Sequence, residues 1–467
     1  MLALTCIVPV ASYGAAKASN WPSFRGDVAT KGVTAAKTPR TSKETVRRWV
    51  KNLIPETDMY SLSNPIIVNN RIYVAVSSGW PATDGKVFAF NLSGKLLRQK
   101  LIDPALNPET GKPYGTPTLG YIGAGGGMVF VPLTDGTVRA LDAVTLEQKW
   151  KSSAFTYADS ANLDPATSEP AIVPYDFSSP ILYRNGYIYT GVAAGWSELP
   201  GCFFALRTAD VDTSKADEVN APAWTWQADG AAEKGYYNVG AAFTKNAVVF
   251  AGTGGLLVTH SLTTSTAALS TYDLGESVKS EMVSDGNAVY GTTMGGRIFR
   301  AAVDSAGKVS AGSVKKAKLS GEQSSVAPVV YRGKVYAVSG KQNFTGKGVG
   351  RLDVFAKNTL KKKSTLDLGD YVSSSPLLSK GYATKANGYK VHLYVMHNAV
   401  SENNVIRVTD SDRLKKPVKA TLFKPGGNQG GASLIADTSG NLYFYSTNTD
   451  AATYKMKADL VSLGIKK

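Results

Sequence analysis

The residues that most often bind metals or act as nucleophiles are scarce in this chain. Its 467 residues include three histidines (His260, His392 and His397) and two cysteines (Cys6 and Cys202). Zinc sites take their cysteine and histidine ligands at short, regular spacings, which do not occur here. Two cysteines also cannot build a disulfide scaffold. We therefore expect neither kind of site, and we interpret Cys202 as a small buried hydrophobic residue.

Motifs for hydrolytic or phosphate chemistry are also missing. The sequence contains no G-x-S-x-G, no H-E-x-x-H and no P-loop. Asp304, Asp410, Asp412 and Asp437 occur in turn-like contexts, where aspartate commonly bonds to its own backbone. A pair of carboxylates forming a glycosidase site stays open as an alternative, because 36 acidic residues allow many pairs in space.

A repeated pattern must position whatever site the chain has. Each copy has a small residue, often a proline, two apolar residues, a tight polar turn, and an alternating aromatic and β-branched run, which predicts two antiparallel strands. The copies span residues 64–76, 116–133, 179–192, 240–253, 279–293, 326–339, 374–397 and 431–447. Their spacing of about 40–63 residues leaves room for two more strands in each copy.

Four antiparallel strands at this period are typical of a β-propeller blade. We therefore predict an all-β fold, an eight-bladed β-propeller of four-stranded blades. Residues 45–53 read as a strand without an entry motif of its own. This strand can complete the last blade, so that both termini close the ring and remove its free edges. Seven blades are the alternative, because the fourth and fifth copies are the weakest.

The stretch TVRALDAVTLEQKW (137–150) resembles the repeat of the pyrroloquinoline-quinone-type (quinoprotein-like) β-propellers, A-x-D-x-x-T-G-x-x-x-W. Ala140, Asp142, Thr145 and Trp150 match, and Leu146 replaces the glycine. The opening NWPSFRGD and the following GV are similar to the leader of secreted members of this family, so the resemblance covers most of the chain. It implies that the tryptophan docks between blades and that the alanine and aspartate fix a turn.

The family includes quinone-dependent alcohol dehydrogenases and cofactor-free scaffolds such as the outer-membrane assembly lipoprotein propeller, so the resemblance alone does not decide the function. A resemblance to the dehydrogenases would imply a vicinal cysteine pair, a tryptophan below the quinone, a Ca²⁺ held by Glu, Asn and Asp, and an Asp base. This sequence has no adjacent cysteines and no carboxylate cluster that we can assign. We expect a binding scaffold without a cofactor; the alternatives are a PQQ- and Ca²⁺-dependent dehydrogenase or a carbohydrate-active propeller.

Long loops are expected on one face of the propeller, where the second-to-third-strand loops and the connections between blades gather. Loops on a rigid scaffold commonly carry function, and aromatic side chains suit a glycan or a peptide. The candidate ligand face consists of Trp80, Tyr114, Tyr157, Tyr175, Trp196, Tyr236, Tyr237 and Phe344. The alternative is that these rings fold over and cap their own blades.

The formal net charge is +16, with basic runs at 314–319, 359–364 and 412–420. Each run is expected near a third-to-fourth-strand turn, toward the outer edge of its blade. The runs could be solvated turns that protect edge strands from pairing, or they could attract an anionic cell-wall polymer. We expect a protein or glycan partner and a monomeric chain. Nucleic acid is not expected, because the sequence has no nucleic-acid-binding motif.

Residues 2–16 are apolar and small, and Ala16-Lys17-Ala18 follows in the form of a signal-peptide cleavage site. We therefore expect residues 1–18 to be a secretory signal-like segment and 19–467 to be one propeller domain, secreted or located in the cell envelope or at the cell surface. A buried first strand is the alternative for the apolar run. No apolar run reaches the roughly 18 residues of a membrane-spanning helix.

Overall fold

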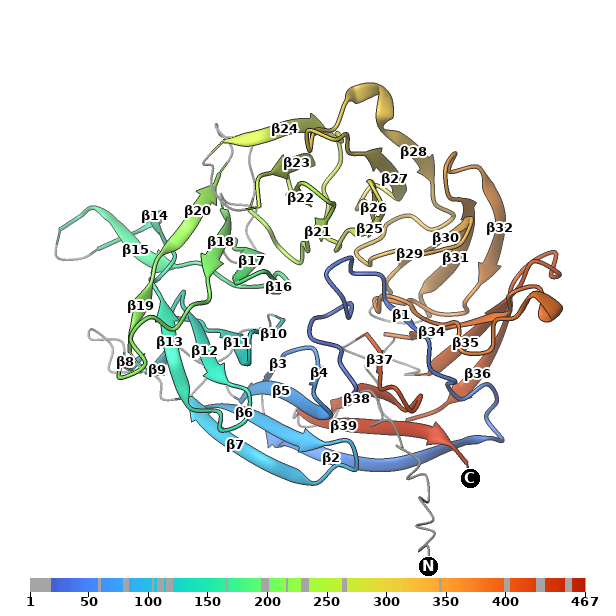
Figure 1. The fold of residues 1–467 in the computed structure, drawn as a ribbon, viewed down its shortest axis with the longest axis horizontal. Helices are drawn as coiled ribbons and strands as arrows, with labels where there is room; N and C mark the ends of the chain where they lie inside the picture. Colours follow the sequence, from blue (N-terminus) through green and yellow to red (C-terminus); the bar gives the residue numbers. More distant parts are fainter. Residues whose placement is uncertain are drawn as a thin grey trace, which may run out of the picture.

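The repeated hairpins fold into small antiparallel sheets that stand side by side in a ring (Figure 1). The computed structural model describes residues 18–466, with gaps at 58–59, 79–83, 103–104, 107–112, 115–120, 165–166, 195–200, 216, 228–234, 263–266, 344–346, 399–403, 426–432 and 450–455. Within these residues eight four-stranded units are present. The prediction of eight blades is confirmed, and the alternative of seven is excluded.

In each blade, strands A to D follow one another from the axis outward. The first four blades consist of β4 (Ile66–Val68), β5 (Arg71–Ser78), β6 (Asp84–Asn91) and β7 (Leu96–Ile102); β10 (Gly123–Gly125), β11 (Met128–Pro132), β12 (Val138–Asp142) and β13 (Gln148–Ser152); β16 (Leu182–Arg184), β17 (Tyr187–Gly191), β18 (Phe203–Arg207) and β20 (Pro222–Trp226); and β21 (Ala242–Phe243), β22 (Val248–Ala251), β23 (Leu256–His260) and β24 (Ala268–Asp273).

The last four blades complete the ring. They consist of β25 (Val283–Asp285), β26 (Ala288–Thr292), β27 (Arg297–Ala302) and β28 (Lys315–Lys318); β29 (Val329–Tyr331), β30 (Lys334–Lys341), β31 (Val349–Ala356) and β32 (Lys362–Asp367); β33 (Leu377–Ser379), β34 (Val391–Met396), β35 (Val405–Asp410) and β36 (Val418–Phe423); and β37 (Ile435–Ala436), β38 (Leu442–Thr449), β39 (Met456–Ile465) and β2 (Thr45–Thr57).

The eighth blade takes its outermost strand from the start of the chain. β2 pairs antiparallel with β39, from Thr45 opposite Ile465 to Thr57 opposite Met456. The two ends of the chain therefore hold the ring closed, as the orphan strand in the sequence predicted, and no blade joint is left open.

A few short elements lie outside this plan. β1 (Val33–Thr34) runs parallel to β33, and β19 (Val219–Asn220) runs parallel to β13. The remaining elements are β3 (Tyr60–Leu62), the hairpins β8 (Ala105–Leu106) with β9 (Pro113–Tyr114) and β14 (Thr156–Leu163) with β15 (Pro170–Pro174), and two 3₁₀ turns, η1 (Ala311–Ser313) and η2 (Lys385–Asn387). Among the described residues, no helix is long and apolar enough to cross a membrane.

The A–B turns explain why the entry motif needs its polar residues. Asn69 and Asn70 have φ values of 47° and 64°, and Asn185 and Gly186 have 52° and 83°. These left-handed conformations suit Asn and Gly, and they match the twist of a two-residue hairpin. Arg332 adopts the same conformation, with φ 54°.

Buried tyrosines on the B strands join neighbouring blades. Seven of them are almost completely buried: Tyr73, Tyr189, Tyr290, Tyr336, Tyr394, Tyr443 and Tyr445. The Tyr189 hydroxyl donates to the Leu262 carbonyl of the following blade at 2.6 Å, and the Tyr336 hydroxyl donates to Asp410 of the following blade at 2.7 Å. Each ring thus buries a large apolar area between two sheets while its hydroxyl keeps a partner.

Candidate functional site

The segment that precedes β2 enters the middle of the ring. In Figure 1 the dark-blue chain around β1 turns into the centre. We call residues 19–34 the leader. At its start Ser19 bonds to Asn70 and to Thr438, which lie in the A–B turns of blades 1 and 8. After the leader, Ala36 accepts a bond from the last residue of β33, next to another A–B turn. The leader therefore enters and leaves the ring through the face of the A–B turns.

Between these points the leader contacts blades on opposite sides of the ring. Trp21 bonds through its backbone to β4 at 2.6 and 3.0 Å. The Phe24 ring lies 4.6 Å from that of Tyr121, just before β10. The Ala29 carbonyl accepts from the amide of Ser284 in β25 at 3.0 Å. A segment that reaches blades 1, 2 and 5 in this way occupies the axis of the propeller.

Arg25 is the charged residue at the deepest part of the leader, and it is 2% exposed. Its Nη1 donates to the Pro376 carbonyl at 2.6 Å and its Nη2 to the Pro328 carbonyl at 3.2 Å, directly before β33 and β29. Its Nε donates to the Thr30 carbonyl at 3.4 Å. Gly32 has φ 60°, and a Cβ there would lie 2.4 Å from the guanidinium carbon. A residue with a side chain at position 32 would collide with Arg25.

Glu281 is the buried carboxyl group on the axis. It is 3% exposed, and its side chain bonds to Ser375 of blade 7. Burial raises the pKa of Glu281 to about 8, and the positive charge of Arg25 offsets part of this rise. Burial also lowers the pKa of Arg25 to about 10, which keeps the guanidinium charged at neutral pH. Blades 5, 6 and 7 and the leader thus share one buried polar network.

These residues do not fit a quinone with a bound Ca²⁺. A hard cation needs several oxygen ligands in one place, and no group of three or more His, Cys, Asp or Glu residues that could hold a metal occurs in the described part of the chain. The guanidinium of Arg25 sits on the axis and would repel a cation. Cys202 is buried, its pKa is raised to about 12 by burial, and no second cysteine is adjacent in the sequence. No reaction step through a quinone follows from these residues.

For four residues of the candidate ligand face the structure gives little or no position. Trp80, Trp196 and Phe344 lie outside the described residues. Tyr114 belongs to β9, in the short hairpin with β8. Whether these residues form a ligand face stays a prediction.

The positions of the other four are described. The rings of Tyr157 and Tyr175 lie 4.8 Å apart beside the β14–β15 hairpin. The ammonium of Lys279 lies 5.3 Å from the ring centre of Tyr237. Tyr236 is 1% exposed and packs between blades 3 and 4, so its ring belongs to the core and is not available to a ligand. This residue follows the alternative interpretation, in which a loop aromatic caps its own blade.

The repeat-motif residues lie in the C–D turn of blade 2 and in the two strands that it joins, β12 and β13. Asp142 accepts bonds from the amides of Val144 and Thr145 at 2.8 and 2.9 Å. Leu146, in the place of the family glycine, has φ 63°. Trp150 is fully buried, and its Nε1 donates to the Thr208 carbonyl of blade 3 at 3.2 Å. Ala140 is also fully buried. The turn and the tryptophan thus link two blades.

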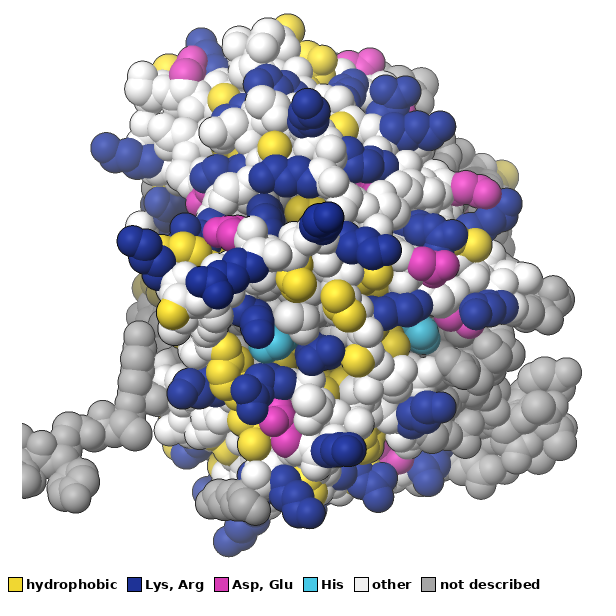
Figure 2. All heavy atoms as spheres, turned by 90° about the vertical axis from the view of Figure 1, so that its right-hand side faces the viewer, with side chains coloured by type: hydrophobic (Ala, Val, Ile, Leu, Met, Phe, Trp, Pro, Cys, Tyr) yellow, Lys and Arg dark blue, Asp and Glu magenta, His cyan; other side chains and the backbone are white. Residues whose placement is uncertain are grey.

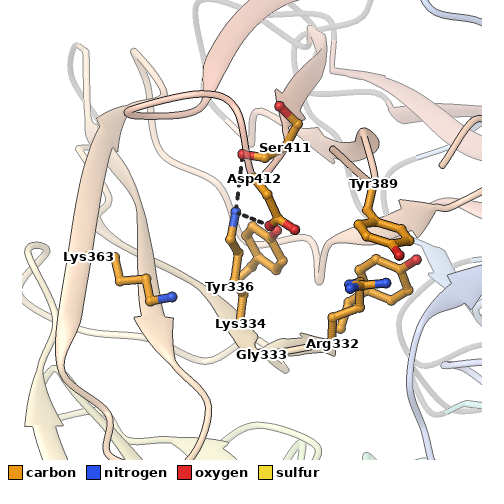
Figure 3. Close-up of a pocket in the computed structure, with 9 residues that line it drawn as sticks. Arg332, Gly333, Lys334, Tyr336, Lys363, Tyr389, Ser411 and Asp412 are labelled. Atoms are coloured by element: carbon orange, nitrogen blue, oxygen red, sulfur yellow. Dashed lines mark hydrogen bonds and ion pairs between the residues drawn. The ribbon is translucent and has the colours of Figure 1, made fainter. Parts of the chain in front are cut away.

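Sequence reasoning missed a polar hollow of about 490 Å³ between the A–B turns of blades 6 and 7 (Figure 3). The Arg332 guanidinium stacks 3.2 Å from the ring centre of Tyr389. Lys334 bonds to Asp410 at 2.8 Å and lies 3.6 Å from Asp412. The Lys363 side chain of β32 points into the hollow from the side.

One loop length in the sequence could have indicated this hollow. The A–B connection of blade 7, residues 380–390, is longer than the two-residue turns of other blades and contains η2. A Thr384–Asn387 capping box holds this loop, and the Gly388 carbonyl accepts from the amide of Asp412 at 2.8 Å. The loop is therefore fixed against the C–D turn of its own blade, which forms one wall of the hollow.

Comparisons with known proteins agree on the fold. No family model matches the chain, and no curated protein matches it. Among solved structures, a europium-containing methanol dehydrogenase superposes with a TM-score of 0.64 at 10% identity, over 96% of this chain and 99% of that one. The quinohemoprotein alcohol dehydrogenase from Comamonas testosteroni gives 0.60 at 13% identity, over 95% and 80%. BamB from Moraxella catarrhalis gives 0.50 at 14% identity, over 89% and 97%.

Identities this low relate the folds and leave the activity open, and the similar structures include both dehydrogenases and BamB. The ring of eight blades, its closure by both termini and these superpositions lead to one conclusion. This chain has the fold of the eight-bladed, PQQ-like β-propellers.

Proposed function

We propose that this chain is a non-catalytic binding propeller that holds a protein or glycan partner outside the cytoplasm. The observation that carries the proposal is the leader on the axis, where the dehydrogenase members of the fold are expected to hold their cofactor. In this chain the guanidinium of Arg25 and the buried carboxyl of Glu281 occupy the axis. The export signal expected at residues 1–18 and the location in the cell envelope stay predictions.

A titration with the cofactor tests this proposal. The melting temperature of the protein is measured with and without pyrroloquinoline quinone and Ca²⁺, together and separately, because a ligand that binds only the folded state must raise it. We expect no saturable rise at a large excess of quinone. A known quinone dehydrogenase serves as the positive control for the reconstitution.

An activity assay completes the test. Dye reduction with primary alcohols is measured after the same reconstitution, and we expect the rate of a blank without protein. A saturable rise in melting temperature together with alcohol-dependent dye reduction would show that the chain is an enzyme, and the binding proposal would fall.

A further inference from the structure

A second hollow of about 450 Å³ adjoins the first one and shares Ser411 with it. It lies on the other side of the 380–390 loop, against β35 and the start of β36. Its charged lining residues are Lys390, Arg407 and Arg413, and no described lining residue is acidic. In the first hollow, by contrast, Asp410 and Asp412 partly balance the lysines and the arginine.

The charges in the second hollow are available to a ligand. Lys390 and Arg413 are exposed, and neither takes part in an ion pair with another described residue. Arg407 is half-buried; its Nη1 donates to the Arg40 carbonyl at 2.6 Å, and its Nε has no partner among the described residues. Three cations thus surround a space whose described lining contains no carboxylate.

The pKa of the neighbouring His392 is affected by the positive charges of this hollow. His392 lies behind Thr409, which lines the hollow, and its Nδ1 is 3.0 Å from the Thr409 hydroxyl. Burial, followed by the charges of Arg407, Arg40 and Lys390, lowers the pKa of His392 to about 4, while Glu44 acts weakly in the opposite direction. Burial is the larger cause, and the nearby positive charges add to it, so His392 stays neutral at neutral pH.

The remaining lining has the mixed character of a sugar-binding surface. Asn387, Thr409 and Ser411 add polar groups to the lining, and each of them already has a hydrogen-bond partner within the protein. Leu414 and Val418 are 38% and 50% exposed and add apolar surface beside the cations. Hydroxyls, amides and small apolar surfaces complement the hydroxyl groups and the C–H faces of a pyranose ring. No described lining residue has an aromatic ring on which a nucleic-acid base could stack.

We propose that this second hollow binds an acidic saccharide unit, in which a carboxylate or sulfate group meets Lys390, Arg407 and Arg413. The proposal rests on the function as a binding propeller and names the class of its ligand. The unit would belong to a longer anionic chain, since Lys415 and Lys416 continue from the hollow along the C–D turn. Figure 2 shows this side of the molecule, where Lys and Arg side chains are spread widely with fewer Asp and Glu between them.

The test separates a site from general attraction by the net charge. Binding of a heparin hexasaccharide is measured by calorimetry at about 0.15 M salt, where the Debye length is about 8 Å. The variant Lys390→Ser with Arg413→Ser is compared with Arg47→Ser with Lys95→Ser. Both doubles remove one lysine and one arginine, all four residues are exposed, and the control pair lies on blades 8 and 1.

We expect the Lys390/Arg413 double to bind the hexasaccharide at least about tenfold more weakly, a change of about 1.4 kcal/mol, and the control to change by less than about twofold. A neutral dextran hexamer should not bind. Equal losses in both doubles would overturn the proposal, because binding would then follow the net charge alone. Competition by a short DNA duplex at equal charge concentration would overturn it in favour of a nucleic-acid site.

The melting experiment with quinone is run on the same samples. A wild-type protein that binds neither quinone nor hexasaccharide refutes the acidic saccharide and leaves the binding function intact. Saturable quinone binding with dye reduction refutes the function itself. Unchanged circular dichroism of both doubles establishes that they are folded.

Discussion

The buried carboxyl of Glu281 should make the stability of the propeller depend on pH. Its pKa in the folded protein is raised from 4.5 to about 8, mainly by burial. The folded state therefore keeps the proton more strongly than the unfolded chain does. This stabilisation is fully present below pH 4.5, and it is lost as the pH rises toward 8. We expect Glu281→Gln, which cannot ionise and still offers an amide to Ser375, to remove this dependence.

The size of the effect follows from the pKa values. A pKa that moves from 4.5 to about 8 corresponds to about 5 kcal/mol of unfolding free energy. An unfolding entropy of about 2.1 cal/mol/K per residue gives about 1 kcal/mol per degree for a chain of 467 residues. About 4 kcal/mol of this falls between pH 5 and pH 9, so the difference in melting temperature between Glu281→Gln and the wild type should grow by about 4 °C in that window.

Differential scanning fluorimetry at several pH values in this window measures the change. Glu322→Gln is the matched control, because Glu322 is an exposed carboxylate of the same type. Its melting curve should follow that of the wild type at every pH. Parallel profiles for Glu281→Gln and the wild type would refute the reasoning, since they would mean that Glu281 is ionised and stabilised in the folded state.

Three further changes test other parts of the structure. Gly32→Ala should lower the melting temperature by more than Gly127→Ala does. Both glycines have positive φ, but a Cβ at position 32 collides with the buried guanidinium of Arg25, whereas nothing lies within 4 Å of a Cβ at position 127. Equal losses of melting temperature would contradict this. Tyr336→Phe should lower the unfolding free energy by about 1.5–3 kcal/mol in a denaturant titration, since it removes a hydrogen bond to the charged Asp410, and an unchanged value would argue against that bond. The wild-type protein should lose stability as the pH falls from 6.5 to 4, because the folded state holds His392 neutral with a pKa of about 4. His392→Gln should reduce this loss in melting experiments. If the variant lost as much stability as the wild type, His392 would not be the cause.

Local chemistry explains why the architecture was visible in the sequence. Turn pairs such as Asn69-Asn70 and Asn185-Gly186 announce hairpins because few other residues adopt positive φ easily. The orphan strand at 45–53 could be assigned to the last blade because a ring has only one free edge to fill. These inferences depend only on residues that are neighbours in the sequence and on the requirement that the ring of blades closes.

The axial network could not be found in this way. Arg25 bonds to carbonyls that lie 303 and 351 residues away, and nothing in its local sequence indicates burial. The burial of Tyr236 could not be predicted for a related reason, because residues of two blades pack around its ring. The second hollow depends on a contact between the 380–390 loop and the turn after β35, so its cations come together only in the folded blade.

The strand pair that closes the ring also sets a schedule for making the protein. β2 is synthesised near the start and β39 almost 400 residues later. At about 5–20 residues per second, β2 waits roughly 20 to 80 s for its partner to leave the ribosome. During that time the unpaired edge of β2 and the leader have no complete ring to join. The nascent chain should therefore depend on a chaperone, or on transport in an unfolded state, until its last strand has been made.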